Sequence, residues 1–563
     1  MLITYLGHAG FCVELAKSTI IMDPWLSPFG AFDSAWFQYP CNHHLNDLVE
    51  RKLQDATKDR YIYISHEHQD HFDLAFLNSL KTRDFKFIVP QFFRSGLFES
   101  LTHYQCGGVI LCRSDEEVRL ADGFIKLYLY GHGFERDSAI LVHHDGQSFL
   151  NLNDCRLYDH LQEIRKTHGD IDVVAGQFSG ASWHPTCYEY PERVYQRISQ
   201  QKTISKFEAI ARAIEAINAK IFLPSSGPPC FLDPTLFHLN LEPINIFSRP
   251  RQLIRYLQER FDRSEQRHIP EIMEMMPGDV LDVTGCNLAY KAEDRLSEDG
   301  VEAYLRSYAA RYEVFFRERQ LGCSSHLDDI LRRLREAIEY KLSLFELSHL
   351  VTTALYLSLQ EAPDKLIRVD FQSRRVEVVS QVIDPHYYSL STPSWQMERV
   401  LDGKMTWDNF SLTFRMRIKR EPDVYVPLIH DFLLTEAEDL KQFCSEWLEL
   451  EAKLEENDER MTVEAGGCRY SVSRFCPHQG ADLSEGWLEE NRYLICPGHW
   501  WRFDLWEQGR CEASNATINA VALGQDRAKS PIQTAQPAAV PERISRSVPL
   551  RELCGRRLIR PGN

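Results

Sequence analysis

The stretch "ISHEHQDHFD", residues 64–73, decides how the first part of this chain is interpreted. It reads His66-x-His68-x-Asp70-His71 and directly follows the β-type run "DRYIY". Such a cluster places three imidazoles and a carboxylate within one loop at the end of a strand. Imidazole and carboxylate ligands together suit zinc, iron or manganese. The stretch therefore predicts a metal site rather than a solvated polar loop.

The residues around this stretch alternate between short β-type runs and helical runs. Most β-type runs end in Gly, Asn, Asp or Pro, and the chemically reactive residues follow their carboxyl ends. The run "SKFEAIARAIEAINA", residues 205–219, has the apolar period of a helix and precedes the β-type run "AKIFLP". This alternation predicts an α/β domain over residues 1–245.

This domain resembles the metallo-β-lactamase fold, an αββα sandwich, in the order of its motifs. Asp23 in "IIMDPWL" stands where that family has an early strand-end aspartate. The resemblance implies two metal positions joined by one carboxylate, with Asp70, His71 and Asp154 as the catalytic residues. The implied ligands are His66, His68 and His132 for one metal, Asp70, His71 and His238 for the other, and Asp154 between the two.

The last of these ligands is open on the sequence alone. His238 follows "LPSSGPPCFLDPTLF", which resembles the corresponding segment of the phospholipase-D-like amidases, and His184 in "GASWHP" competes with it. His8 in "LGHAG" is expected near the metals without being a ligand. Residues in loops at the same strand ends are candidates for binding a substrate, although such residues serve packing just as often: Trp25, Phe178, Trp183, His184 and Tyr188.

A second metal pattern lies in "CPHQGADLSEGWLEENRYLICPGHWWRFD", residues 476–504. Cys476-x-His478 and Cys496-x-x-His499 resemble the ligand pairs of a Rieske [2Fe–2S] domain, in which the cysteines hold one iron and the histidines hold the other. A structural zinc site with two cysteines and two histidines is the alternative. The prolines after both cysteines and the aromatic "HWWRFD" favour Rieske. The departure is "CPGHWW", where oxygenase Rieske domains more often have His-Gly-Trp.

The remaining residues divide into three further parts. Residues 246–435 are predicted to form a helical and α+β middle domain, with a long amphipathic segment over residues 325–360 that is broken near "SL". This domain resembles sterol-carrier-protein-like domains, and we expect a scaffold or dimerisation role, with substrate binding as the alternative. Residues 436–525 are expected to form a linker helix and a small all-β Rieske domain. Residues 526–563, rich in Pro, Ala and Gln at their start, are expected to be a flexible tail.

Composition limits the partners and the compartment. The net charge of −17 argues against non-specific nucleic-acid binding and against an anionic membrane surface. No apolar run reaches the length of a membrane helix, and no secretory signal is visible at the N-terminus. The fifteen cysteines show no disulfide framework, which is typical of reduced thiols. We therefore expect a cytoplasmic protein without nucleic-acid or membrane partners.

The two metal patterns together predict the function. A Rieske cluster transfers electrons and does no bond chemistry itself, so it must supply another site. Zinc has no redox chemistry, and the metallo-β-lactamase-type site is therefore expected to hold iron. The two modules resemble, in reversed order, those of CMP-N-acetylneuraminic acid hydroxylases. This resemblance implies O₂-dependent hydroxylation or N-oxygenation of a small-molecule substrate at one or two non-heme irons, with two as the expected number.

Partners and alternatives follow from the same features. The chain has no flavin or nicotinamide fingerprint, so an external ferredoxin or reductase is the expected electron donor. Residues 246–455 separate the two sites in sequence, and electron transfer between the subunits of a homo-oligomer would bring them together. The alternative function is a zinc-dependent hydrolase of phosphodiester, amide or lactone bonds with the Rieske domain as a redox sensor. A third is an electron-transfer protein whose first domain is inactive.

Overall fold

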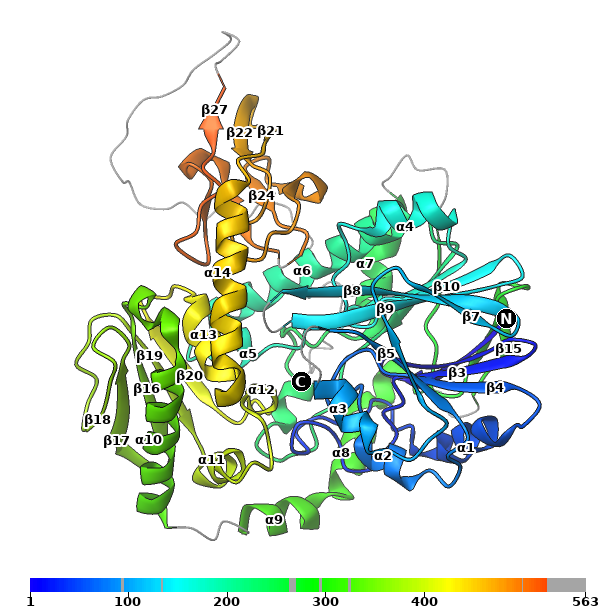
Figure 1. The fold of residues 1–563 in the computed structure, drawn as a ribbon, viewed down its shortest axis with the longest axis horizontal. Coiled ribbons are helices and arrows are strands. Elements are labelled where there is room, and N and C mark those ends of the chain that lie inside the picture. Colours follow the sequence, from blue (N-terminus) through cyan, green and yellow to red (C-terminus); the bar gives the residue numbers. More distant parts are fainter. Residues whose placement is uncertain are drawn as a thin grey trace, which may run out of the picture. The chain divides into compact units, whose positions relative to one another are not determined.

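The computed structural model describes residues 1–92, 96–132, 135–262, 270–292, 296–321, 326–498 and 500–523 (Figure 1). The chain divides into two compact units, Met1–Glu449 and Leu450–Asn563. Three features predicted from the sequence lie outside this description. They are the side chain of His132, the whole of His499 and the expected tail over residues 526–563.

The first unit begins with two mixed sheets that face each other. The eight-stranded sheet has the order β15-β14-β1-β2-β3-β4-β5-β6, and the seven-stranded sheet has the order β13-β12-β11-β10-β9-β8-β7. The strands of the first are β1 (Leu2–Gly7), β2 (Gly10–Glu14), β3 (Ser18–Met22), β4 (Asp59–Tyr63), β5 (Lys86–Pro90), β6 (Val109–Cys112), β14 (Val280–Asp282) and β15 (Asn287–Tyr290). The strands of the second are β7 (Glu117–Leu120), β8 (Gly123–His132), β9 (Glu135–His144), β10 (Gln147–Asn151), β11 (Val173–Gln177), β12 (Ile221–Ser225) and β13 (Glu271–Ile272).

Apolar side chains from both sheets form the core between them, including Phe11, Ile88, Ile140 and Phe149. Helices cover the two outer faces through separate cores. The first sheet packs against α1 (Asn46–Gln54), α2 (Leu74–Ser79) and α3 (Gly96–Thr102), and the second against α4 (Leu161–His168), α6 (Glu192–Ile217) and α7 (Pro250–Asp262). These layers confirm the predicted αββα sandwich. The sandwich also takes in strands from residues 271–290, beyond the boundary predicted at residue 245.

The middle part of the chain forms an α+β layer within the first unit. Its five-stranded sheet has the order β18-β17-β16-β19-β20 and shares one core with helices of the same region (Figure 1). The strands are β16 (Ala354–Leu359), β17 (Ala362–Asp370), β18 (Arg375–Val379), β19 (Tyr387–Thr392) and β20 (Arg417–Glu421). The helices that share this core are α10 (Leu327–Leu344), α11 (Ser394–Leu401), α12 (Trp407–Ser411) and α13 (Pro427–Leu434). The preceding helices α8 (Val301–Ala310) and α9 (Glu313–Leu321) pack in a separate core with Phe37 and Cys230.

The amphipathic segment over residues 325–360 breaks near "SL", as expected, because α10 ends at Leu344. The end of the same segment forms the central strand β16, which the sequence analysis did not predict. All six residues of β16 are buried between β17 and β19. A strand that is buried on both faces carries a continuous apolar run without alternation, which resembles a buried helix in sequence.

The helix α14 (Leu440–Glu456) leads into the second unit, which is small and built from antiparallel strands. A three-stranded sheet has the order β21-β22-β27, and a four-stranded sheet has the order β23-β24-β25-β26. The bounds are β21 (Arg460–Ala465), β22 (Cys468–Ser473), β23 (Trp487–Glu489), β24 (Tyr493–Ile495), β25 (Arg502–Asp504), β26 (Arg510–Cys511) and β27 (Val521–Ala522). The all-β domain predicted at this end of the chain is confirmed.

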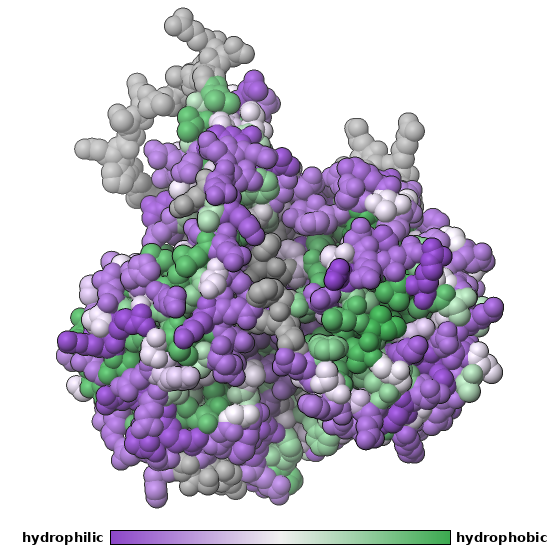
Figure 2. Space-filling model, viewed as in Figure 1, coloured by the Kyte–Doolittle hydropathy of each residue, from purple (hydrophilic) through white to green (hydrophobic). Residues whose placement is uncertain are grey.

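The surface is mainly hydrophilic on the face drawn in Figure 2, with one larger apolar area at the right. Among the described residues, no helix combines the length and the apolar character needed to cross a membrane.

Candidate functional site

Parallel pairing of strands brings the first site residues together. β3 runs parallel to β4 with Met22 opposite Tyr63, so Asp23 and the loop after β4 leave the sheet at the same edge. Asp23 is fully buried and accepts hydrogen bonds from the main chain and the hydroxyl of Ser65, at 2.8 and 2.6 Å. These bonds fix the start of the histidine-rich loop.

Several residues at this edge have a strained backbone. His8, Asp23 and Asn153 have φ values of 53°, 38° and 51°, in the left-handed region that non-glycine residues rarely adopt. Each such residue costs of order 1–3 kcal/mol, and such residues gather at active sites and ligand sites. The strain therefore marks the strand-end edge as a functional region.

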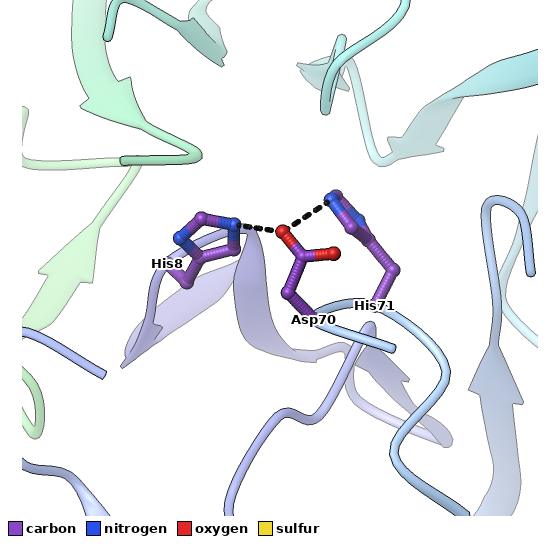
Figure 3. Close-up of side chains that lie close together, drawn as sticks. All are labelled: His8, Asp70 and His71. Carbon is purple, nitrogen blue, oxygen red and sulfur yellow. Dashed lines mark hydrogen bonds and ion pairs between the residues drawn. The ribbon is translucent and has the colours of Figure 1, made fainter. Parts of the chain in front are cut away.

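Two groups of possible metal ligands share one histidine. Ligand atoms of His8, Asp70 and His71 lie within 4.8 Å of one another, and so do those of His66, His71 and Asp154. Figure 3 shows the Asp70 carboxylate between the two rings of the first group. Its Oδ2 lies 2.9 Å from His8 Nε2 and 3.8 Å from His71 Nε2. In the second group, His71 Nε2 lies 3.5 Å from Asp154 Oδ1.

His66 and His68 aim their nitrogens at each other. His66 Nε2 lies 2.8 Å from His68 Nδ1, and the rings are close to perpendicular, at 78°. At most one proton can lie between these two nitrogens. At least one of the nitrogens therefore directs its lone pair toward the other. Two imidazole nitrogens in this arrangement suit a shared metal ion.

Each histidine of the loop has a carboxylate on its other ring nitrogen. The distances are 3.2 Å from His66 Nδ1 to Asp137 Oδ1, 3.1 Å from His68 Nε2 to Asp408 Oδ2, and 2.8 Å from His71 Nδ1 to Asp23 Oδ2. A carboxylate in this place holds the ring proton on the outer nitrogen and leaves the inner nitrogen as a lone pair for a metal.

The inner atoms lack ordinary partners. Asp70 Oδ1, His71 Nε2 and Asp154 Oδ1 are buried and make no hydrogen bond within the described structure. Buried polar atoms without a partner are rare and costly, and three of them in one place indicate a ligand. Imidazoles and carboxylates without a thiolate fit zinc, iron or manganese. The residues present therefore fit the metal ions that the sequence predicts.

The electrostatics of the site also favour a cation. Burial lowers the pKa of His71, but the charges of Asp154 and Asp70 outweigh burial and raise that pKa well above its ordinary value. Burial likewise lowers the pKa of His68, and the hydrogen bond and charge of Asp408 outweigh it and raise that pKa to about 9. The carboxylates thus stabilise positive charge here, whether it is a proton or a metal ion.

The structure does not bring His238 into this cluster. His238 lies on a short 3₁₀ helix, its side chain is 53% exposed, and its Nε2 lies 3.7 Å from Glu242. The end of β12, at the same edge of the sheet as β11, carries Ser225 and Ser226 instead of a histidine. The competitor His184 is also elsewhere, with its Nε2 3.1 Å from the hydroxyl of Tyr190. His8, expected as a bystander, is the histidine that faces Asp70.

The aromatic substrate candidates are mostly packed in cores. Trp25 is fully buried, and its ring meets that of His8 edge to face at 5.1 Å. Phe178 belongs to the core between the second sheet and its helices. Trp183 and Tyr188 line a small apolar cavity beside His430, and neither is grouped with the metal ligands.

Two site residues were missed by the sequence analysis. Asp137 lies on β9, and burial raises its pKa although His66 opposes that effect. Its position in "ERDSAILV", at the start of a buried strand, was the available signal. Asp408 follows Trp407 in the middle region, and no local pattern connects it to a histidine 340 residues earlier.

The second unit presents the other predicted site. Cys476 and Cys496 are buried free thiols. Burial and the neighbouring Cys496 raise the pKa of the Cys476 thiol well above its ordinary value. The ring of His478 stacks on Trp501, with centroids 4.3 Å apart. Two adjacent buried thiols that form no disulfide, with a histidine in the same loop, fit a [2Fe–2S] cluster, whose fourth implied ligand, His499, lies outside the described residues.

Two models of known protein families match this chain. A model of the β-lactamase superfamily domain matches residues 2–225, and a model of the Rieske [2Fe-2S] domain matches residues 445–523. The chain joins a β-lactamase-superfamily domain to a Rieske domain. The Rieske domain supports a [2Fe–2S] cluster.

Two similar proteins match this chain over most of its length. The chain is 29% identical over 541 residues to a Rieske 2Fe-2S iron-sulfur protein of Mycolicibacterium smegmatis, covering 91% of this chain and 98% of that protein. It is 21% identical over 453 residues to cytidine monophosphate-N-acetylneuraminic acid hydroxylase of Danio rerio, covering 75% of this chain and 70% of that protein. The part of this chain aligned with the hydroxylase is longer than the two matched domains combined. The similarity therefore includes part of the middle region.

A solved structure with a similar first domain is CmlA, a diiron beta-hydroxylase from Streptomyces venezuelae. It has a TM-score of 0.32 and 16% identity, and covers 48% of this chain and 52% of that protein. Metal-dependent hydrolases are also among the similar proteins.

Proposed function

We propose that this protein is a Rieske-dependent oxygenase, in which electrons from the second unit are used at the metal centre of the first. The reaction would hydroxylate or N-oxygenate a small molecule with O₂. The observation that carries the proposal is the presence, in one chain, of an electron-transfer domain and a buried centre of histidines and carboxylates. Hydroxylases with a similar sequence support the same class, and the hydrolase alternative leaves the Rieske domain without a use.

The ligands divide between two positions. His66, His68 and Asp154 would hold one metal, together with His132 as the sequence implies. His71 and Asp70 would hold the other. The geometry favours His8 over His238 as the further ligand of this second position, because His8 Nε2 already meets Asp70 Oδ2. Iron in such a site supplies O₂ activation when it receives electrons, which zinc cannot do.

The protein residues prepare this site before any reaction. Asp23, Asp137 and Asp408 hold the outer protons of the three loop histidines, so each ring keeps one orientation and one tautomer. Trp25 and Phe32 pack against His8 and His68 and reduce the access of water to these rings.

The electron donor and the assembly are part of the proposal. An external ferredoxin or reductase would reduce the Rieske cluster. Transfer to the metal centre would take place within a homo-oligomer, and its substrate would be a small molecule.

Metal analysis tests this proposal. Full-length protein is produced with iron and zinc both available, its iron and zinc per chain are counted by elemental analysis, and the iron sites are identified by Mössbauer spectroscopy. We expect the two irons of the cluster and about one or two further irons per chain. Reduction should then cause O₂ uptake, and Cys476→Ser should abolish that uptake. Further metal that is zinc, with a hydrolytic activity that survives Cys476→Ser, would overturn the proposal.

A further inference from the structure

The carboxylates behind the loop histidines come from different parts of the chain. Those of His66 and His71 belong to the sandwich, whereas His68 is bonded to a residue of the middle region. His68 Nε2 lies 3.1 Å from Asp408 Oδ2, across 340 residues of sequence. Both residues belong to the first unit.

Asp408 is held on a short, well-anchored helix. The hydroxyl of Thr406 caps α12 by accepting from the main chain of Asn409 at 3.1 Å. Trp407 is only 7% exposed, and its main-chain N–H donates to Glu436 Oε1 at 2.6 Å. The ammonium group of Lys341 lies 4.5 Å from the centre of the Trp407 ring. These contacts fix the neighbour of Asp408 in the core, so the carboxylate approaches His68 from a rigid element.

The middle region also holds the turn that packs on His68. Phe32 meets the His68 ring edge to face at 5.9 Å, and its N–H donates to Gln69 Oε1 at 2.6 Å. The next residue, Asp33, accepts from Arg399 at 2.7 Å. Two further arginines of the middle region, Arg319 and Arg415, also lie against Asp33. The turn over residues 32–34 has three consecutive positive φ values, of 50°, 58° and 60°, and these ion pairs hold it there.

The bond to Asp408 decides which nitrogen of His68 is available. A neutral imidazole, the form that binds a metal, keeps its lone pair on Nδ1 when it donates from Nε2 to a carboxylate. Nδ1 is the atom that faces His66 Nε2 at 2.8 Å. We propose that Asp408 is a positioning residue that fixes the ring and tautomer of His68 for metal binding, and that the middle region thereby completes the metal site instead of serving only as a scaffold. This inference rests on the metal site of the proposed function, but not on its redox reaction.

A purely structural ion pair would behave differently. The side chains of His68 and Asp408 are 32% and 38% exposed, and ion pairs with that exposure contribute little to stability. Loss of a carboxylate behind a metal-bound histidine, in contrast, typically weakens metal binding ten- to hundredfold. Metal affinity therefore separates the two roles, whereas stability does not.

The experiment uses full-length protein with its Rieske cluster and Zn²⁺ as the probe, since zinc binding needs no electron transfer. Competition with a coloured chelator gives the affinity of wild type, Asp408→Ala and Asp408→Asn. Asp402→Asn is the matched control, because it removes a carboxylate of the same region that pairs with Arg333 at 2.7 Å. The visible spectrum of the cluster shows that the second unit stays intact.

We expect Asp408→Ala to lose ten- to hundredfold in Zn²⁺ affinity. Asp408→Asn should lose less, because its amide oxygen still accepts from Nε2, and this variant decides the matter if the alanine variant does not fold. Asp402→Asn should bind as wild type does. Binding of the Asp408 variants within twofold of wild type, or an equal loss in Asp402→Asn, would overturn the inference. If zinc binding depends on Asp408 but the protein has no O₂-dependent activity, the oxygenase proposal is refuted and the role of Asp408 stands. A wild type that binds no metal besides the cluster would overturn both.

Discussion

Arg415 pairs with two buried carboxylates, and Arg415→Met tests how firmly the middle region is tied to the loops of the metal site. Its Nε lies 2.8 Å from Asp233 Oδ2, and its Nη1 donates to the main-chain oxygen of Asp33 at 3.1 Å. The side chains of Arg415, Asp233 and Asp33 are 2%, 1% and 3% exposed. Water therefore cannot compensate any charge that is left alone there.

The expected loss follows from this burial. Removing one partner of a buried ion pair costs about 3–5 kcal/mol, because the other charge stays in the interior. Asp233 bears most of that cost, since Arg415 is its charged partner. Asp33 bears less, because Arg399 still lies 2.7 Å away. We expect Arg415→Met to lower the free energy of unfolding of the first unit by about 3–5 kcal/mol.

The assay follows urea unfolding of the first unit by tryptophan fluorescence, with the visible absorbance of the Rieske cluster as an internal reference for the second. In the double variant Arg415→Met/Asp233→Asn, both charges are gone, and most of the stability should return. Arg332→Met is the control, because Arg332 is 58% exposed and ion pairs with that exposure contribute little to stability. A loss below about 1 kcal/mol in Arg415→Met, or a double variant no more stable than the single one, would refute the reasoning.

Three further predictions address the two centres and the core. Cys476→Ser should abolish the visible spectrum of the cluster, whereas Asp154→Ala should keep that spectrum and lose the other metal, as metal analysis would show. Trp500 has a φ of 58°, so Trp500→Gly should give a more stable Rieske domain than Trp500→Ala by about 1 kcal/mol, measured by thermal bleaching of the cluster. Burial lowers the pKa of Lys206 to about 7, against 10.5 in the unfolded chain. Between pH 7 and 10.5 the unfolded chain therefore binds more protons at this residue than the folded chain does. The contribution of Lys206 to the free energy of unfolding rises with pH over that range. Lys206→Met should lose this part of the slope in unfolding experiments from pH 7 to 10, and Lys220→Met, a surface control, should keep it.

The sequence was most informative where strands end. His66, His68, Asp70 and His71 follow β4 within one loop, and Asp154 follows β10 by three residues. The proximity of the first four was predictable, because a short loop limits where its side chains can reach. Asp154 follows a strand of the other sheet, and the family resemblance was what implied its place beside them. The Rieske pattern was equally local, since each pair of ligands lies within four residues of sequence.

Contacts between distant segments could not be predicted in this way. Asp408 reaches His68 only because the middle region packs on the 32–36 loop through a common core. No spacing or periodicity encodes that packing. His238 shows the opposite error, because a resemblance in sequence placed it at the metals and the chain turns it toward Glu242 instead. His8 was expected near the metals, and its position facing Asp70 agrees with that expectation; a lone histidine in a strand turn carries no pattern that would predict ligation.

The number of carboxylates around the three loop histidines bears on which metal the site suits. Asp70 and Asp154 face the histidines from inside, and each ring has a further carboxylate behind it. In a buried site of low dielectric, these carboxylates attract a metal ion more strongly when the metal ion carries a higher positive charge. A zinc ion in a hydrolase keeps the same oxidation state throughout the reaction, so this dependence on the charge of the metal does not affect its chemistry. If the site held an iron that alternated between oxidation states, these carboxylates would stabilise its oxidised form more strongly and would lower its reduction potential.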